Sequence, residues 1–308
     1  VACAIPGVMA ARTISNWKER TITIMVAPLM SCSARIPVYT LLIALVIPNE
    51  YFMGLNVQGL VLFGLYALGT VSALLVAFIL QKIMKTKNKG FLLLEMPSYK
   101  LPHWGNLMYT VFEKVKVFVF GAGKIILAIS IILWAMATYG PGDRMDNSEV
   151  EANIYAQENN YSEEKTEQYI ASVRLENSFI GIMGKTIEPV IQPLGYDWKI
   201  GISLITSFAA REVFVGSMAT IYAVQDDGAE NRPLIEKMRN EKKRDGSPVY
   251  SLASGVSLLV FYVFAMMCMA TVAVVKRETK SWKWPLIQMG YMGVLAYLSA
   301  WISFVLLS

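Results

Sequence analysis

The chain has 308 residues, of which 55% are hydrophobic and only 17% are charged, and its mean hydropathy is +0.45. Soluble domains carry about a quarter charged residues, so this composition excludes an ordinary soluble domain and indicates an integral membrane protein. The net charge of +5 is spread over the loops and does not suggest a nucleic-acid partner, and three cysteines are too few for the disulfide framework of a secreted protein.

The first residues, Val1-Ala2-Cys3, lie inside an apolar segment, and no signal-peptide pattern is present. We therefore expect residues 1–20 to be the tail of a membrane domain that begins earlier in a longer protein.

Apolar runs of 18 residues or more recur along the chain and predict six membrane spans. The first run contains Pro28, Arg35 and Pro37, so its helix is expected to break near Cys32. Broken helices at membrane depth are tolerated where they are buried in protein or line a cavity, which makes this break a candidate functional element. The predicted spans are 21–48, 57–81, 118–139, 198–224, 251–275 and 284–307.

The charges of the connections predict how the spans are oriented. Lysines and arginines gather in 82–117 and 276–283, which the positive-inside rule places in the cytoplasm. The acidic 140–176 loop is expected outside, and parity places the polar 225–250 loop there too. Segment 177–224 then begins and ends outside, and its glycines and prolines favour a re-entrant hairpin over two crossings.

Residues 91–117 are predicted to form an amphipathic elbow at the cytoplasmic membrane surface, apolar on one side and basic on the other. The single histidine, His103, lies in this elbow. We interpret it as an interfacial residue rather than a ligand, because metal-binding histidines come with nearby partners.

Two short matches between the ends of the chain predict an inverted repeat. Residues 7–10 (GVMA) match 216–219 (GSMA), which sets Cys3 opposite Glu212, and Cys32 matches Cys268. The charge pattern gives the matching spans opposite orientations. This arrangement is typical of transporters whose site lies near the membrane midplane, at the interface of the repeats.

If the repeat holds, Cys3, Cys32, Cys268 and Glu212 converge near the midplane. Three sulfurs and one carboxylate suit a borderline divalent ion such as Fe²⁺, and the thiols would release protons on binding it. A carboxylate inside an apolar run is energetically costly, which makes Glu212 the strongest candidate among the polar residues for a functional role. Each cysteine alone is equally compatible with a small buried hydrophobe.

Four further residues are expected to have a gating or structural role: Pro6, Arg35, Pro37 and Arg211. For the two arginines, a structural role is at least as plausible as gating, because each could bind the carbonyls that a broken helix leaves without partners.

Four segments carry a resemblance to a known family: residues 3–12 (CAIPGVMAAR), 31–35 (SCSAR), 96–104 (MPSYKLPHW) and 210–216 (AREVFVG). They resemble the membrane part of the bacterial ferrous iron transport protein B (FeoB) family, in the versions of Bacteroides-like bacteria. Ala2 stands where the family's first motif has glycine. The resemblance implies Fe²⁺ uptake across the cytoplasmic (inner) membrane and maps the family's membrane cysteines onto Cys3, Cys32 and Cys268.

The resemblance also implies an all-α polytopic fold with inverted-repeat, broken helices and nucleoside-transporter-like gate domains. It assigns 1–20 to the tail of the first gate, 21–90 to a central C-terminal-type membrane domain, 118–224 to the second gate and 251–308 to C-terminal transmembrane helices. The family's GTP- and Mg²⁺-binding G domain is not among these residues, so we expect the chain itself not to be an enzyme. The implied partners are the lipid bilayer, that G domain, a small FeoA-like protein and a second copy of the chain.

Two other functions remain open. A small-solute carrier of the nucleoside type would fit the gate architecture, but it would need hydrogen-bonding Asn, Gln and Ser side chains around its site. A membrane thiol redox protein would need a reactive pair of cysteines, and Cys3 and Cys32 have no CxxC partner.

Overall fold

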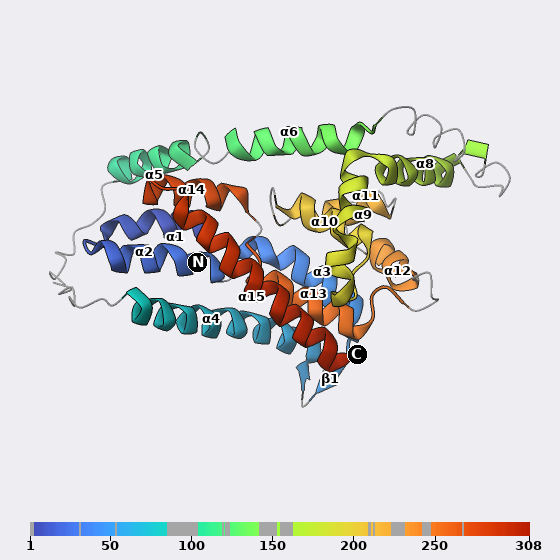
Figure 1. Cartoon of the computed structure of the whole chain (residues 1–308), viewed down its shortest axis with the longest axis horizontal. Coiled ribbons are helices and arrows are strands. Elements are labelled where there is room, and N and C mark those ends of the chain that lie inside the picture. Colours follow the sequence, from blue (N-terminus) through green and yellow to red (C-terminus); the bar gives the residue numbers. More distant parts are fainter. Residues whose placement is uncertain are drawn as a thin grey trace.

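The computed structural model describes residues 3–30, 32–52, 54–84, 104–118, 120, 124–141, 153–154, 163–208, 211, 213–222, 232–241, 248–266 and 268–308. This part is helical apart from a small hairpin of β1 (Tyr51–Phe52) and β2 (Leu55–Asn56), in which Tyr51 pairs with Asn56 (Figure 1). Four stretches are long and apolar enough to cross a membrane: Trp17–Val46, Val57–Met84, Leu252–Thr279 and Lys283–Leu307.

The chain begins with the short helices α1 (Ala4–Ala10) and η1 (Ala11–Thr13), followed by a broken helix. Its first arm is α2 (Trp17–Val26), and its second arm is α3 (Ile36–Val46); the 3-10 turns η2 (Ala27–Leu29) and η3 (Ser33–Arg35) lie between them. Pro28 lies in η2, where it supplies no N–H for a continuing helix. The predicted break near Cys32 is confirmed.

A second broken helix, which the sequence had suggested as one continuous span over 251–275, lies near the C-terminal end. It consists of α13 (Leu252–Phe264) and α14 (Met269–Thr279). The break at 265–268 contains no proline, and for this reason the apolar pattern did not indicate it. The connection predicted at 276–283 is also shorter than expected, because α14 continues to Thr279.

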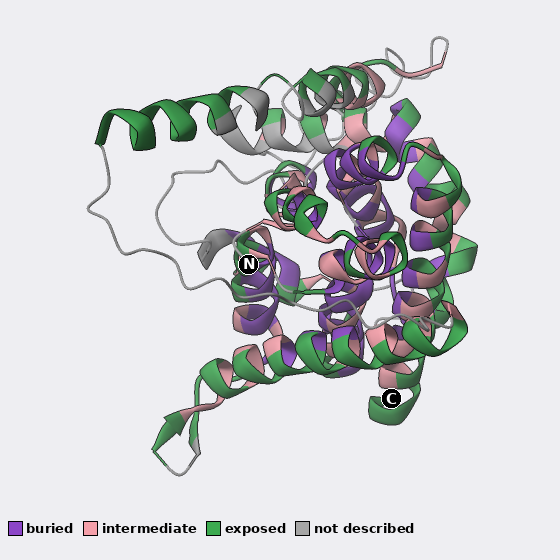
Figure 2. Cartoon of the chain, turned by 90° about the vertical axis from the view of Figure 1, so that its left-hand side faces the viewer, coloured by how far each residue is buried: buried purple, intermediate pink, exposed green. Residues whose placement is uncertain are grey.

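Two long helices complete the membrane-spanning set. α4 (Val57–Met84) packs against α2, and α15 (Lys283–Leu307) packs against α13. Both coincide with predicted spans. The outer faces of α4 and α15 are largely exposed, whereas the two broken helices are buried to a much larger extent. Figure 2 shows the buried residues in the interior of the molecule. An exposed apolar face of this kind is what a lipid-facing helix requires.

The region between the two broken helices does not form the predicted span 198–224, and the predicted span 118–139 is described only in part. It contains α6 (Lys124–Thr138), α8 (Glu163–Asn177), α9 (Phe179–Ile191), η5 (Gln192–Leu194), α10 (Trp198–Ser207) and α11 (Val213–Ile221). α10 and α11 are two short helices that run back on one another, so the single span predicted over 198–224 is wrong. Residues 119 and 121–123 of the other predicted span lie outside the described residues.

Helices α9 and α10 are joined by a tight turn and pack closely. Gly195 ends η5 with φ +82°, a conformation that favours glycine, and a Cβ there would meet the ring of Phe304. Gly184 lies against Ile202, so the two helix backbones approach directly. The hairpin expected within 177–224 is present in this helical form.

The segment predicted as a polar loop at 225–250 contains a packed helix, α12 (Arg232–Asn240). The α12 residues Leu234 and Met238 are buried. Arg239, also in α12, donates hydrogen bonds to the carbonyls of Ala44 and Leu45 at the end of α3. Two apolar residues four apart give this charged sequence one buried face. The polar loop expected over 225–250 therefore contains a helix.

The amphipathic elbow appears as α5 (Trp104–Phe118), which lies beside α6 along one edge of the molecule (Figure 1). Its exposed apolar residues recur at helical spacing: Trp104, Leu107, Met108, Val111, Phe112 and Val115. This stripe is suited to lying in a membrane surface. The rest of the elbow, including His103, is outside the described residues.

The two broken helices run in opposite directions. At one end, Arg20 near the start of α2 contacts Glu278 near the end of α14. At the other end, Val46 at the end of α3 packs against Gly255 near the start of α13. The broken helices α2–α3 and α13–α14 are therefore antiparallel, as the charge pattern of the connections predicted. The inverted repeat as a whole stays a prediction.

Candidate functional site at the two helix breaks

All three cysteines lie immediately before a helical element. Cys3 precedes α1, Cys32 precedes η3 and Cys268 precedes α14, and each has an extended backbone. Their side chains are neither fully buried nor fully exposed, and no disulfide joins them. Each thiol therefore lies at a residue with non-helical backbone. At the breaks beside Cys32 and Cys268, backbone N–H and C=O groups are without helical partners and can face an ion.

The first break exposes four carbonyls, and side chains from two elements bind them. The buried Arg35 donates to the carbonyls of Pro28 (3.2 Å) and Leu29 (3.4 Å). From α15, Gln288 donates to Ile24 (3.1 Å) and Met25 (2.8 Å), and Tyr291 donates to Met25 as well (2.5 Å). These bonds replace the helical partners that the break removes.

The second break depends on a residue from the preceding hairpin. Arg211, which is 5% exposed, donates to the carbonyls of Tyr262 (3.0 Å) and Ala265 (2.6 Å) at the end of α13. The Met269 N–H, at the start of α14, donates to the carbonyl of Phe208 (3.1 Å). The tip of the α10–α11 hairpin is thus joined to the break from both sides. Both arginines named from the sequence bind carbonyls.

The structure brings two of the three cysteines onto one small cluster. Cys3 and Cys268 pack against a group of apolar side chains that is separate from the main core, and Cys32 does not belong to it. Cys32 lies in the other break, on the chain segment that carries Arg35, whose charge interacts with that of Arg211. The apolar cluster consists of Ile5, Val8, Ala11, Ile24, Ala270, Val274 and Val275.

Glu212 lies outside the described residues, although Arg211 and Val213 on either side of it are described. Across the described ranges, no three His, Cys, Asp or Glu side chains are grouped closely enough to hold a metal ion. The convergence of Cys3, Cys32, Cys268 and Glu212 therefore stays a prediction.

Pro6 and Pro37 begin helices rather than interrupt them. Each lies in the first turn of its helix, α1 or α3, and each side chain is exposed. Proline is well accommodated in a first turn, since the N–H that it lacks would have no helical partner there. Pro6 therefore helps to set the start of α1 directly after Cys3, and Pro37 helps to set the start of α3 after η3.

A cavity of about 400 Å³ lies between α6, α9, α10 and α11. Its polar lining consists of three hydroxyl side chains, Thr206, Ser217 and Thr220, and the first two share a hydrogen bond of 2.7 Å. The other lining residues are apolar or glycine. Ser217 belongs to the segment 216–219 that the sequence matches singled out, but the cavity itself left no signal in the sequence.

Two family models match the chain. The model described as "Nucleoside recognition" (Gate) matches residues 119–282, and the model described as "Ferrous iron transport protein B C terminus" matches residues 62–114. The chain belongs to the FeoB family. It corresponds to the C-terminal membrane part of that family.

Curated relatives agree with this assignment. The chain is 43% identical to a protein of Leptospira biflexa named Fe(2+) transporter FeoB, over 98% of this chain and 41% of the relative. It is 33% identical to a protein of the same name from Methanocaldococcus jannaschii, over 97% of this chain and 39% of the relative. A Porphyromonas gingivalis relative, 34% identical, is named as a fusion of Fe(2+) transport protein A and FeoB, and the match covers 97% of this chain and 36% of that protein. The chain thus spans about two fifths of the length of these FeoB relatives, and no solved structure matches it.

Proposed function

We propose that the chain is the membrane permease part of a ferrous iron transporter. In this proposal Fe²⁺ crosses the cytoplasmic membrane along Cys3, Cys32, Cys268 and Glu212, at the interface of the two inverted repeats. The observation that carries it is that both helix breaks place a cysteine at the start of the returning helix. Soft thiolates at that depth favour Fe²⁺ over Mg²⁺ or Ca²⁺.

The packing of the cysteines supports a path rather than a single closed site. Cys3 and Cys268 adjoin one apolar cluster, while Cys32 lies in the other break. An ion that moves between two ligand groups is bound at each strongly enough to enter and weakly enough to leave. We infer that Glu212, the repeat counterpart of Cys3, serves the Cys32 side.

The names of the relatives extend the proposal to the whole protein. Since the chain spans about two fifths of their length, coupling to a G domain that binds GTP and Mg²⁺ belongs to the proposal. So do insertion in the bacterial inner membrane and a second copy of the chain. A small FeoA-like partner is supported by the relative in which proteins A and B are fused.

The test is Fe²⁺ uptake and binding by the whole protein. We expect Cys3→Ser and Cys268→Ser to lower uptake at least about tenfold, because each removes a soft ligand, and Glu212→Gln to weaken Fe²⁺ binding by the purified protein. Met183→Leu, a change at an exposed sulfur of α9 away from the breaks, is the matched control. Unchanged uptake in both cysteine variants would refute the metal assignment.

A carrier of nucleoside-like solutes is the second candidate, because the Gate model that matches 119–282 is described as nucleoside recognition. The cavity lined by Thr206, Ser217 and Thr220 is the candidate binding site for such a solute, although its lining lacks the amide side chains that would recognise a nucleobase. Uptake of labelled nucleosides that survives the cysteine substitutions would support this candidate. A thiol redox protein, the third, would require a disulfide that forms under mild oxidation.

A further inference from the structure

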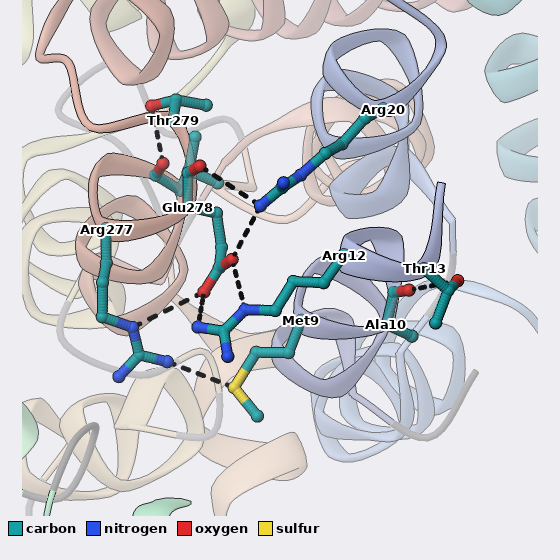
Figure 3. A network of polar contacts seen from close by, with 9 residues as sticks. Met9, Ala10, Arg12, Thr13, Arg20, Arg277, Glu278 and Thr279 are labelled. Carbon is teal, nitrogen blue, oxygen red and sulfur yellow. Dashed lines mark hydrogen bonds and ion pairs between the residues drawn. The ribbon is translucent and has the colours of Figure 1, made fainter. Parts of the chain in front are cut away.

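A buried carboxylate at the far end of the Cys3–Cys268 helix pair is held by three arginines. The side chain of Glu278 is 2% exposed and accepts two hydrogen bonds from Arg12, Nε to Oε2 at 2.6 Å and Nη2 to Oε1 at 2.5 Å (Figure 3). Arg20 Nη2 lies 3.2 Å from Oε2, and Arg277 Nε lies 3.6 Å from Oε1. This cluster is not part of the site described above.

These residues join three elements. Arg12 belongs to η1, directly after α1; Arg20 belongs to α2; and Glu278 belongs to α14. Helices α1 and α14 pack against each other, and both run from a cysteine to this cluster: Cys3 to Arg12 and Cys268 to Glu278. The two thiols therefore lie at one end of a parallel helix pair, and the ion pairs lie about 13–15 Å away at the other, at 1.5 Å per residue.

Apolar side chains fill the contact between the thiols and the ion pairs. Val8 and Ala11 of the first segment and Val274 and Val275 of α14 are all buried in the small cluster. A hydrated ion cannot pass between packed apolar side chains. For an ion to leave Cys3 and Cys268 toward this end, α1 and α14 must separate.

The cluster lies on the basic face of the molecule. Lys18 Nζ donates to the carbonyl of Met84, which sets the start of α2 beside the end of α4, and Arg20 brings the end of α14 to the same place. The positive-inside rule assigns a face of this charge to the cytoplasm.

The charges are arranged so that one contact can open. Arg12 makes the two shortest bonds, yet its side chain is 56% exposed, so water can replace Glu278 as its partner. Glu278 would keep Arg20, which is 24% exposed, and Arg277, so the buried carboxylate would not be left unpaired. The hydrogen bond and charge of Glu278 hold the pKa of Arg12 above its usual range, so protonation does not switch this contact at physiological pH.

We propose that Glu278 and its three arginines form a cytoplasmic latch, which closes the exit from Cys3 and Cys268 and opens when Arg12 leaves Glu278. The inference rests on the proposed function for the identity of the ion. The latch itself is defined by contacts and can be tested without iron.

The test is thiol labelling in inside-out membrane vesicles from cells that make the whole protein. A membrane-impermeant maleimide is added on the cytoplasmic side, and the labelling rate of each cysteine is read by peptide mass spectrometry. We expect Glu278→Gln and Arg12→Gln to raise the rates at Cys3 and Cys268 about fivefold or more, the lower bound of typical coupling between conformational states. Cys32 should keep its rate, since it belongs to the other break.

Two further variants separate the latch from a general effect of charge or folding. Lys276→Gln removes one positive charge, as Arg12→Gln does, but from the helix that carries Glu278. The Lys276 ammonium lies over the Trp282 ring rather than on Glu278, so this variant should change no rate. Arg12→Lys keeps a cation that can reach Glu278 and should restore part of the slow labelling that Arg12→Gln loses.

Unchanged rates at Cys3 and Cys268 in both single variants would overturn the latch, and so would an equal rise at all three cysteines, which signals unfolding. A protein that shows the expected labelling but takes up no Fe²⁺ would refute the proposed function while the latch stands.

Discussion

Both helix breaks leave backbone carbonyls without helical partners, but different residues bind these carbonyls in the two breaks. In the first break the chain supplies its own donor, Arg35, and two prolines, Pro28 and Pro37, prevent a continuous helix. The second has no proline, and its carbonyls are bound by Arg211 from the neighbouring hairpin. The cause of the first break therefore lies in its own sequence, with Gln288 and Tyr291 of α15 as additional donors, whereas the second rests on tertiary contacts alone.

This difference bears on transport. A break fixed by proline cannot straighten, whereas the second could become a continuous helix if Arg211 withdrew, since every residue from Ala265 to Met269 has a backbone N–H. We therefore expect the break before Cys268 to be adjustable and the break before Cys32 to be fixed.

The largest expected effect comes from removing the two arginines. Arg35→Met should lower the free energy of unfolding by about 3 kcal/mol or more, since the carbonyls of Pro28 and Leu29 lose their donor in a break that cannot close. Arg211→Met should cost less, because α13 and α14 can join and bind their own carbonyls. Thermal unfolding of the purified protein measures both.

Arg239→Met is the control for this pair, because Arg239 also donates to two carbonyls but is exposed. It should cost less than about 1 kcal/mol. A larger loss for Arg211→Met than for Arg35→Met would contradict the contrast between the breaks.

The next effect concerns the contact that joins the two broken helices at the end opposite Glu278. Gly255→Ala would drive a Cβ into the side chain of Val46 and should cost about 1–3 kcal/mol through overpacking. Gly290→Ala in α15, where a Cβ meets nothing within 4 Å, should leave stability unchanged or raise it slightly. If both variants unfolded at the same temperature, the two breaks would not be coupled at this contact.

A smaller effect, confined to the first break, is expected from Gln288→Leu. The carbonyl of Ile24 would lose its donor, while Tyr291 would still bind Met25, so we expect a loss of about 1–2 kcal/mol. Thiol labelling of Cys32 should change and that of Cys268 should not. Gln58→Leu removes a hydrogen bond to the carbonyl of Ile47, outside both breaks, and should leave the labelling rates of all three cysteines unchanged.

The sequence predicted those features whose causes lie within a few residues. The break near Cys32 follows from its prolines, and the long helices over 57–84 and 283–307 follow from uninterrupted apolar runs. The break before Cys268 could not be predicted in the same way, because its cause, Arg211, lies 54 residues from Ala265.

Of the candidate site, the sequence indicated the cysteines and the carbonyl-binding arginines but not how the cysteines group. Glu278 was missed altogether. Its one signal is that it is the only acidic residue in the basic stretch 276–283. Two of its three arginine partners, Arg12 and Arg20, come from elements that only the fold brings beside it.

The smallest expected effect tests what the prolines do. Pro37→Ala restores an N–H in the first turn of α3, where none is needed, so the cost should be below about 1 kcal/mol and should arise mainly from the unfolded chain. Arg35 and Pro28 would still hold the break open, and the labelling rate of Cys32 should stay as it is. A marked change at Cys32 would mean that Pro37, rather than the arginine–carbonyl bonds, defines the break. The first break would then be fixed by one proline alone, and Arg35 would be free to serve the path of the ion.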